Sequence, residues 1–538
     1  MPIAPGLAPN AGSDPDVPAL PEHSPPGSYV PGSLIGGPLG RHARRGVLPT
    51  LFVLVIVTVL ACLAGYAQKF PCRDVGNWKH NYQYTRVCYS DILPLYSTEK
   101  LADGKTPYVD TPVEYPVVIG AAMQGGAKVA ELAPSDNFIE RNATFFDATA
   151  ILLTIAALIA VLCTALTAGH RRMDAILLAA APLLAFHAFT NWDLLAVAFT
   201  AAGLLAWSKK APAVAGLLFG FGAATKAYPL LILLALGLLA YRAGRLRVWS
   251  RCLAFAVGAL AVTYAAVWPF AGRYLGVGGR HNNLWKFIEL NQKRGADWDS
   301  LAYVVEYFGR TTTSLRIGVV SVVIGVIAVI VVALWRPTTR AVLTTAGVVA
   351  LLAILVTVTA GYARGNGGVI SPSALNWAGE IGMVIALVVI GLIVLTAPRR
   401  PRVPQIAFLV VAGFLLVNKV DSPQYSLWLL PLAVLAYPRW KPLLAWQLIE
   451  IFEVVMRYLW FIYDDSTAHG KAGVSEGWFV SAVVLRQAAV LVLAGLIIRE
   501  IYRPKLDLVR EAGVDDPAGG LLDGVPDRRA SEMTAAFE

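Results

Sequence analysis

The short polar segments of this chain are of two kinds, and they alternate between apolar runs long enough to cross a membrane. One kind is rich in basic residues: 41–45, 170–172, 209–210, 242–251, 336–340, 399–402, 439–441 and 499–505. The other kind carries acids, amides and tyrosines: 89–91, 114–116, 191–193, 225–229 and 418–425. Basic loops mark the cytoplasmic side of membrane proteins. The first kind is therefore predicted to face the cytoplasm and the second to face outward.

Composition supports a membrane protein. The chain has 538 residues, of which 57% are hydrophobic and 15% are charged, whereas soluble domains are about 25% charged. Its net charge of +10 lies in loops beside apolar runs, where orientation and lipid headgroups account for it. We therefore predict a multi-pass protein of the cell (plasma) membrane, with membrane lipid and no nucleic acid among its partners.

The apolar runs predict an all-α bundle of about 14 membrane-spanning helices (range 11–14) at roughly 20 residues each. They lie near 47–67, 144–168, 173–190, 191–207, 211–224, 227–241, 252–270, 313–335, 341–360, 377–397, 404–419, 424–437, 441–462 and 478–499. An even count places both termini in the cytoplasm. One more span at 113–132 would move the basic segment 170–172 outside, so 113–132 is predicted to lie in the interface or to re-enter.

Three parts follow from these runs. Residues 1–46 and 504–538 are predicted to be disordered cytoplasmic tails, because neither can bury enough apolar surface to offset its ordering entropy. Residues 47–503 form the membrane domain, with structured outer loops at 68–141, 271–312 and 361–376. We predict a disulfide between Cys72 and Cys88, because both lie in the first outer loop, in a compartment that permits disulfides; the alternative is two unpaired thiols.

Two carboxylates of the first outer loop are the candidate catalytic residues. Asp91 could accept the proton of an acceptor hydroxyl as that hydroxyl attacks a sugar; alternatively it is solvated or caps the following helix. Glu114 could face the same pocket, or it could be a charge favoured by a helix dipole.

Two lysines between tightly spaced apolar runs are candidates for phosphate binding. Lys226 has almost no polar neighbours in sequence, and an intramembrane lysine is functional by default; alternatively it reaches the interface. Lys419 repeats the pattern, although Asp421 could simply pair with it. The full set of predicted substrate-binding residues is Asn191, Asp193, Lys226, Tyr228, His281, Arg294, Lys419 and Gln424. Asp193 could equally be a dipole partner at a helix start.

Several known motifs are absent from the sequence. It contains no P-loop, no HExxH, no GxSxG, no paired CxxC and no His, Cys and acid cluster with metal-site spacing. We therefore expect neither a metal nor another cofactor.

The order of Asp91, Glu114-Tyr115-Pro116, Asn191-Trp192-Asp193, 224–230 and 418–425 resembles glycosyltransferase family 87, a family of actinobacterial enzymes of the GT-C type. The resemblance covers roughly residues 48–500. It implies transfer of mannose or arabinofuranose from a polyprenyl-phosphate donor to a cell-envelope glycolipid or wall glycan on the outer face. It also implies Asp91 as the base, Glu114 in reserve, and Lys226 and Lys419 on the donor phosphate. Ser90 precedes Asp91 where many GT-C enzymes have a second acid.

A transporter or flippase of lipid-linked sugars is the alternative. It would be expected to place charges near mid-helix and to show internal repeats, whereas the polar motifs here gather at one predicted face. A non-enzymatic scaffold would leave Lys226 and Lys419 unexplained.

Overall fold

The computed structural model describes residues 47–75, 78, 81–133, 137–276, 279–311, 361–362, 365, 367–465, 472–510 and 514–527. The chain divides into two compact units, Met1–Val47 and Leu48–Glu538, and the architecture is that of the second unit. The predicted tail 1–46 and the predicted spans 313–335 and 341–360 lie outside the described residues.

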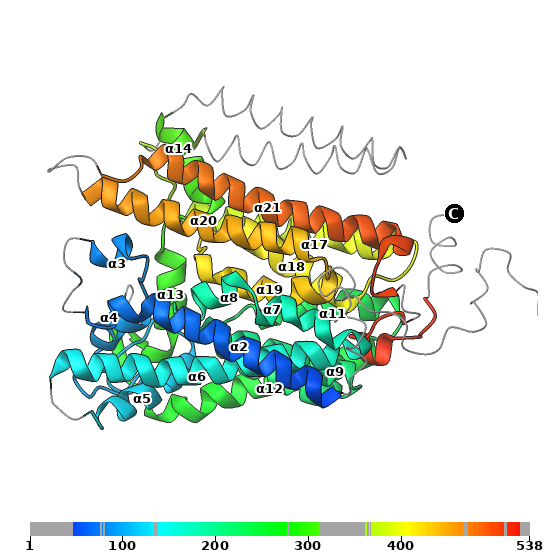
Figure 1. Ribbon diagram of the computed structural model, residues 1–538, viewed down its shortest axis with the longest axis horizontal. Coiled ribbons are helices and arrows are strands. Elements are labelled where there is room, and N and C mark those ends of the chain that lie inside the picture. Colours follow the sequence, from blue (N-terminus) through cyan, green and yellow to red (C-terminus); the bar gives the residue numbers. More distant parts are fainter. Residues whose placement is uncertain are drawn as a thin grey trace, which may run out of the picture. The chain divides into compact units, whose positions relative to one another are not determined.

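The described part of the chain is almost entirely helical (Figure 1). Its helices are α2 (Val47–Lys69), α3 (Tyr82–Thr85), α4 (Ile92–Thr98), α5 (Val117–Ala130), α6 (Phe138–Thr167), α7 (Ile176–Ala179), α8 (Pro182–His187), α9 (Asp193–Ser208), α10 (Pro212–Ala223), α11 (Pro229–Arg242), α12 (Leu246–Val267), α13 (Lys286–Lys293), α14 (Leu301–Thr311), α17 (Pro372–Thr396), α18 (Val403–Val417), α19 (Ser426–Ala436), α20 (Trp440–Asp465) and α21 (Glu476–Tyr502). A single antiparallel hairpin, β1 (Arg273–Gly276) with β2 (Gly279–Asn282), is the sheet found in this part.

Five of these helical segments are long and apolar enough to cross a membrane: Val47–Cys72, Phe138–Thr167, Leu246–Phe270, Pro372–Thr396 and Glu476–Tyr502. Six shorter apolar segments of 10–17 residues accompany them, including α9, α10, α11 and α18. The helical membrane class is therefore confirmed, and the count of 14 spans stays a prediction.

Two stretches show how local sequence sets helix length. The predicted span 173–190 is wrong as one helix, because Pro182 begins a new helix and Ala181 before it is extended, with ψ 123°. A proline lacks an N–H and disfavours the α conformation at the residue before it. Helix α5 has 14 residues, or about 21 Å at 1.5 Å per residue. That length falls short of a hydrocarbon core of about 30 Å, as do those of α10 with 12 residues and α11 with 14, so the prediction that 113–132 does not cross stays a prediction.

Helix α10 packs between α9 and α12 at very short range. A β-carbon at Gly216 would lie 2.1 Å from the Cys252 carbonyl oxygen, and one at Gly220 would lie 2.4 Å from that of Ala256. Two glycines one turn apart thus let the backbones of α10 and α12 touch, as small-residue pairs do between membrane helices.

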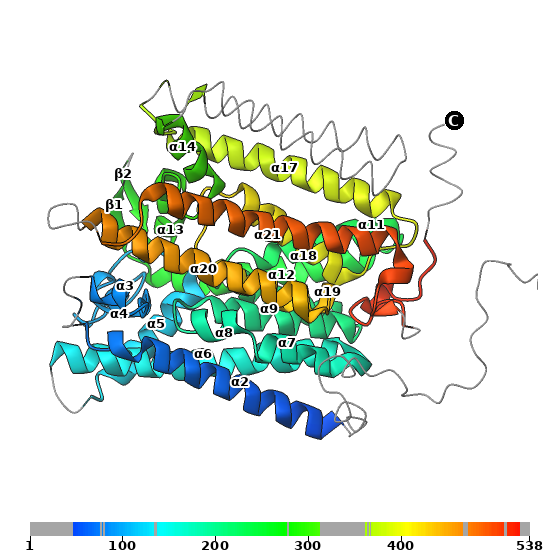
Figure 2. The same cartoon turned by 45° about the horizontal axis from the view of Figure 1, so that its top comes forward.

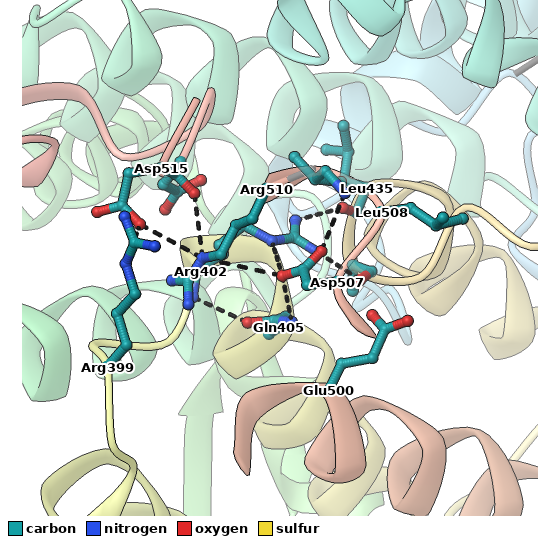
Figure 3. A network of polar contacts seen from close by, with 12 residues as sticks. Arg399, Arg402, Gln405, Leu435, Glu500, Asp507, Leu508, Arg510 and Asp515 are labelled. Carbon is teal, nitrogen blue, oxygen red and sulfur yellow. Dashed lines mark hydrogen bonds and ion pairs between the residues drawn. The ribbon is translucent and has the colours of Figure 1, made fainter. Parts of the chain in front are cut away.

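Within the described residues, arginines of several loops meet at one end of the bundle, which we call the Arg402 end and of which Figure 3 shows a part. Here Arg402, 1% exposed, donates to both oxygens of Asp507, at 2.7 and 3.0 Å. Its remaining donors reach the carbonyl oxygens of Leu435 and Ala436 at 2.8 and 2.7 Å. These carbonyls belong to the last turn of α19, so the guanidinium also caps that helix.

The segment after α21 supplies most of the partners at the Arg402 end. Asp527 pairs with Arg242 at 2.7 Å and with Arg400 at 2.9 Å. The carbonyl oxygen of Leu508 accepts from Arg171 at 3.2 Å, and that of Gly519 accepts from Trp207 at 3.1 Å. Loops far apart in sequence are therefore joined through one C-terminal segment.

The prediction that the chain is disordered from residue 504 is wrong for residues 504–510 and 514–527. Val509, Ala518 and Leu522 are buried there, and Asp507 is 1% exposed. The prediction of disorder was based on the apolar content of the segment alone. Order here comes from aspartates that neutralise buried arginines of distant loops, as charges must do when they leave water.

The opposite end of the bundle, which we call the Asp91 end, gathers α3, α4, α5, α13, α14 and the β1–β2 hairpin (Figures 1 and 2). These elements fold the predicted outer loops 68–141 and 271–312 into structure. The assignment of the Asp91 end to the outer face of the membrane stays a prediction.

Candidate active site

Asp91 stands at the start of α4, on a backbone fixed to the turn between α8 and α9. The Ser90 hydroxyl donates to the Phe189 carbonyl oxygen at 2.6 Å, and the Asp91 amide donates to the Thr190 carbonyl oxygen at 2.9 Å. The Asp91 side chain makes no capping hydrogen bond to α4. The capping alternative is therefore not realised.

Two side-chain amides lie against one oxygen of the Asp91 carboxylate. Asn191 Nδ2 donates to Oδ2 at 2.9 Å, and Gln424 Nε2 lies 3.4 Å from the same oxygen. Both amide residues are buried, whereas Asp91 is half-buried. The pKa of the neighbouring Tyr89 is raised, chiefly by the negative charge of Asp91. The carboxylate is thus oriented and remains reachable, as a general base requires.

Lys226 is linked to Asp91 through Asn191 and two aromatic rings. The Asn191 amide also donates to the Tyr115 hydroxyl at 2.9 Å. Lys226 Nζ lies 5.0 Å from the centre of the Tyr115 ring, 5.4 Å from that of Tyr425 and 3.6 Å from Asp193 Oδ1. Lys226 is 9% exposed, so its ammonium group does not extend into solvent.

Asp193 and Tyr228 lie behind Lys226 and support its surroundings. Asp193 is fully buried at the start of α9 and accepts from Trp428 Nε1 at 2.8 Å. The Trp428 ring is stacked between Tyr228, at 4.5 Å, and Tyr425, at 4.0 Å. These contacts hold Tyr425 against the ammonium group of Lys226.

Glu114 faces a cation from the second outer loop. Its Oε2 lies 3.8 Å from Arg294 Nη2, and both side chains are partly exposed. The Glu114 amide donates to Glu99 Oε1 at 3.3 Å, and burial raises the pKa of Glu99 to about 7. Sequence analysis did not single out Glu99, because an isolated glutamate in a loop gives no signal of burial.

Lys419 is occupied by protein groups, unlike Lys226. Its Nζ donates to the carbonyl oxygens of Arg294 at 2.6 Å, Gln292 at 3.1 Å and Pro372 at 3.5 Å. Burial lowers the pKa of Lys419, and Arg294 lowers it further. The alternative pairing with Asp421 is not formed, because Asp421 binds Arg486 instead. In this structure, Arg294 is the more accessible of the two cations, with 46% of its side chain exposed.

His281 lies on a separate element, strand β2 of the hairpin. Its ring lies 5.8 Å from that of Tyr274 on β1, to which it is paired in register. Asp91, Asn191, Gln424 and Lys226 therefore lie in one cluster, whereas His281 lies on the β1–β2 hairpin.

A buried charge network inside α20 and α21 was missed by sequence analysis. Arg486 donates to Glu450 at 2.7 Å and forms two bonds to Asp421, at 3.1 and 3.2 Å. Gln487 donates to Asp421 at 3.0 Å. Asp421 lies three residues before Gln424, so the network fixes the loop that brings an amide to Asp91.

The same network extends to the second outer loop. Arg457 donates to Asp299 at 2.8 Å, and Glu453 is fully buried beside them on α20. Glu450, Glu453 and Arg457 recur at helical spacing on one face, which is the signal that could have revealed them. Charges thus lie within helices as well as at one face, which removes one argument made against a transporter.

The structure also contains the predicted Cys72–Cys88 disulfide, with the two Cα atoms 5.5 Å apart. It closes the loop that leads into Asp91. In the part of the chain that the structure describes, no group of three His, Cys, Asp or Glu residues could hold a metal ion.

Residues 144–359 match the model of glycosyltransferase family 87. The match covers 216 of the 538 residues, and over this part the chain is similar to the glycosyltransferases of that family. The matched segment contains Asn191, Asp193, Lys226, Tyr228, His281 and Arg294, while Asp91, Glu114, Lys419 and Gln424 lie outside it. Among curated proteins, none matches the chain.

Proposed function

We propose that this protein is a glycosyltransferase that moves mannose or arabinofuranose from a polyprenyl-phosphate donor to a cell-envelope glycolipid or wall glycan, with Asp91 as general base. The Asp91 end faces the outer side of the plasma membrane, and both chain termini lie in the cytoplasm. The basic residues gathered at the Arg402 end support this orientation.

The observation that carries the proposal is the cluster of Asp91, Asn191 and Lys226. The Asn191 amide donates to the Asp91 carboxylate and to the Tyr115 hydroxyl, both at 2.9 Å, and the buried ammonium group of Lys226 lies 5.0 Å from the centre of the Tyr115 ring. Glycosyl transfer from a phosphate donor needs such a base and such a cation, for the acceptor hydroxyl and for the departing phosphate.

In the proposed step, the acceptor oxygen attacks the anomeric carbon as its proton passes to Asp91. The bond from that carbon to the phosphate oxygen breaks, and polyprenyl phosphate leaves with the electron pair. Lys226 stabilises the charge that develops on the phosphate. Arg294, partly exposed beside Glu114, is the second cation within the proposed site, whereas the ammonium group of Lys419 holds the loop in place.

The test is transfer of label from radioactive polyprenyl-phosphate mannose and, separately, polyprenyl-phosphate arabinose. Membranes carrying the wild type, Asp91→Asn or Asp103→Asn are supplied with envelope lipid extracts as acceptor. Asp103 is an exposed aspartate of the same loop and serves as the matched control. We expect transfer by the wild type and the control, and a loss of about a hundredfold or more in Asp91→Asn, the scale of general-base catalysis.

Full activity in a folded Asp91→Asn variant would overturn the assignment of the base. Absence of transfer from both donors by the wild type, with acceptor extracts present, would overturn the choice of donor.

A further inference from the structure

Helix α12 leads into the β1–β2 hairpin, which lies at the Asp91 end (Figure 2). The segment Leu246–Phe270 is long and apolar enough to cross a membrane, and three of the 22 residues of α12 are buried. The ring of Trp285 lies 5.8 Å from that of Tyr264 and 6.0 Å from that of Trp268. Trp268 is 50% exposed and Phe270 is 70% exposed. Aromatic side chains of this kind mark the depth at which a membrane meets water, so the hairpin begins at that depth.

One face of the hairpin packs against α13. Side chains alternate between the two faces along a strand, and directly paired residues share a face. Tyr274 on β1 is paired with His281 on β2. The Tyr274 hydroxyl donates to Glu289 of α13, and Lys286 Nζ lies 4.8 Å from the centre of the Tyr274 ring. The side chains that alternate with Tyr274 therefore lie on the opposite face.

The opposite face of the hairpin combines one apolar side chain with two cations. Leu275 is paired with Arg280 across the strands, and Arg273 stands two residues before Leu275, so all three share this face. Leu275 is 83% exposed, and both arginines are exposed. In the neighbouring part of the chain, the ion pairs among described residues are formed by Lys293 and Arg294 rather than by these two arginines. Both guanidinium groups are therefore available to an external anion.

We propose that this face, made of Arg273, Leu275 and Arg280, binds anionic phospholipid at the surface of the membrane. Leu275 lies among the acyl chains, and the two guanidinium groups bind lipid phosphates. A planar guanidinium offers paired donors to a phosphate, and an element with exposed apolar and basic side chains binds anionic membranes through both. A soluble polyanion would use the arginines but leave Leu275 and Phe270 in water. Lipid is favoured because the aromatic end of α12 continues directly into this face.

The base of the hairpin connects this face to the first outer loop. The Gly272 amide and the Asn283 side chain both donate to the Tyr108 carbonyl oxygen at 2.9 Å. The Tyr108 hydroxyl lies 2.9 and 2.8 Å from the carbonyl oxygens of Tyr115 and Pro116. A hairpin held by lipid therefore fixes the depth of the loop that carries Tyr115. These contacts do not depend on the proposed reaction or on the sugar that is transferred.

The test places a photoreactive side chain on this face. Leu275→p-benzoylphenylalanine is reconstituted into vesicles of phosphatidylcholine and phosphatidylglycerol in equal amounts and irradiated, and mass spectrometry identifies the lipid adducts. We expect the phosphatidylglycerol adduct to exceed the phosphatidylcholine adduct by about fivefold or more, the effect of one basic residue near an anionic surface. Ile151→p-benzoylphenylalanine is the control, because Ile151 is 66% exposed near the middle of α6 and should give the two adducts in equal amounts.

Two double variants, each combined with the photoreactive residue at position 275, separate charge from packing. Arg273→Gln with Arg280→Gln should bring the two adducts to equal amounts, whereas Arg273→Lys with Arg280→Lys should keep the excess of phosphatidylglycerol. Absence of lipid adducts at position 275 in the folded protein would overturn the proposal, since that face would then lie in water. An excess that is unchanged in the glutamine variant, or equally large at Ile151, would overturn it as well. The vesicles contain no sugar donor, so the result stands even if the protein transfers no sugar.

Discussion

Replacement of Arg402 by Met should release the C-terminal segment from the bundle. The change removes four hydrogen bonds, two to Asp507 and two to the end of α19, and leaves the 1% exposed Asp507 with the more distant Arg510, 3.9 Å away, as its remaining cation. Breaking a buried ion pair from one side costs about 3–5 kcal/mol. At 1.4 kcal/mol per tenfold, the undocked population of the segment after α21 should rise by about 140- to 3700-fold.

The assay is limited trypsin digestion of the detergent-solubilised protein, read at Arg510, whose side chain is 5% exposed and becomes accessible when the segment undocks. When cleavage is slower than the return of the segment to the bundle, the rate of cleavage follows the population in which the segment is undocked. Arg399→Met is the matched control, because Arg399 forms a partly exposed pair with Asp515 at 3.0 Å and such pairs contribute about 0–1 kcal/mol. The double variant Arg402→Met with Asp507→Leu should recover much of the protection. Equal cleavage of Arg402→Met and Arg399→Met would refute the reasoning.

Three further predictions concern other parts of the molecule. Gly216→Ala should destabilise the protein by about 1–3 kcal/mol, because the added carbon meets the α12 backbone, whereas Gly258→Ala, whose site is open, should leave the melting temperature nearly unchanged. Gln424→Leu should lower kcat for transfer by about tenfold, the effect of one hydrogen bond of about 1.4 kcal/mol; an unchanged kcat would contradict its role beside Asp91. The pKa of Glu99 is raised to about 7 by burial, so the folded state binds more protons than the unfolded state and stability should fall as pH rises from about 4.5 to 7. Glu99→Gln should remove this slope in thermal melts taken across that range.

The sequence predicted the membrane class, the disulfide and the residues that meet at Asp91. Each of these predictions rests on a local sequence pattern that the fold preserves. Apolar length and basic loops are governed by the bilayer itself. Asp91, Asn191 and Gln424 were found through short motifs, and the structure joins them by hydrogen bonds of 2.9 and 3.4 Å.

What sequence could not show depends on partners far along the chain. Lys226 and Lys419 occur in similar motifs. The ammonium group of Lys226 faces Asp193, whereas that of Lys419 faces three carbonyl oxygens. The order of residues 504–510 and 514–527 comes from arginines more than a hundred residues away. The charges of α20 were visible in the sequence, but only a helical projection would have shown Glu450, Glu453 and Arg457 on one face.

The ion pairs that join the C-terminal segment to the Arg402 end have a consequence for the order of events during synthesis. Asp507 and Asp527 emerge from the ribosome after Arg242, Arg400 and Arg402, the arginines of earlier loops that they neutralise. Those arginines are therefore unpaired while the helices insert, which is when a positive charge directs orientation. Once the last segment is made, it binds the same residues and closes that end. A chain interrupted before residue 507 would insert correctly and still leave buried charges unmatched, a state that membrane quality control can distinguish from the finished protein.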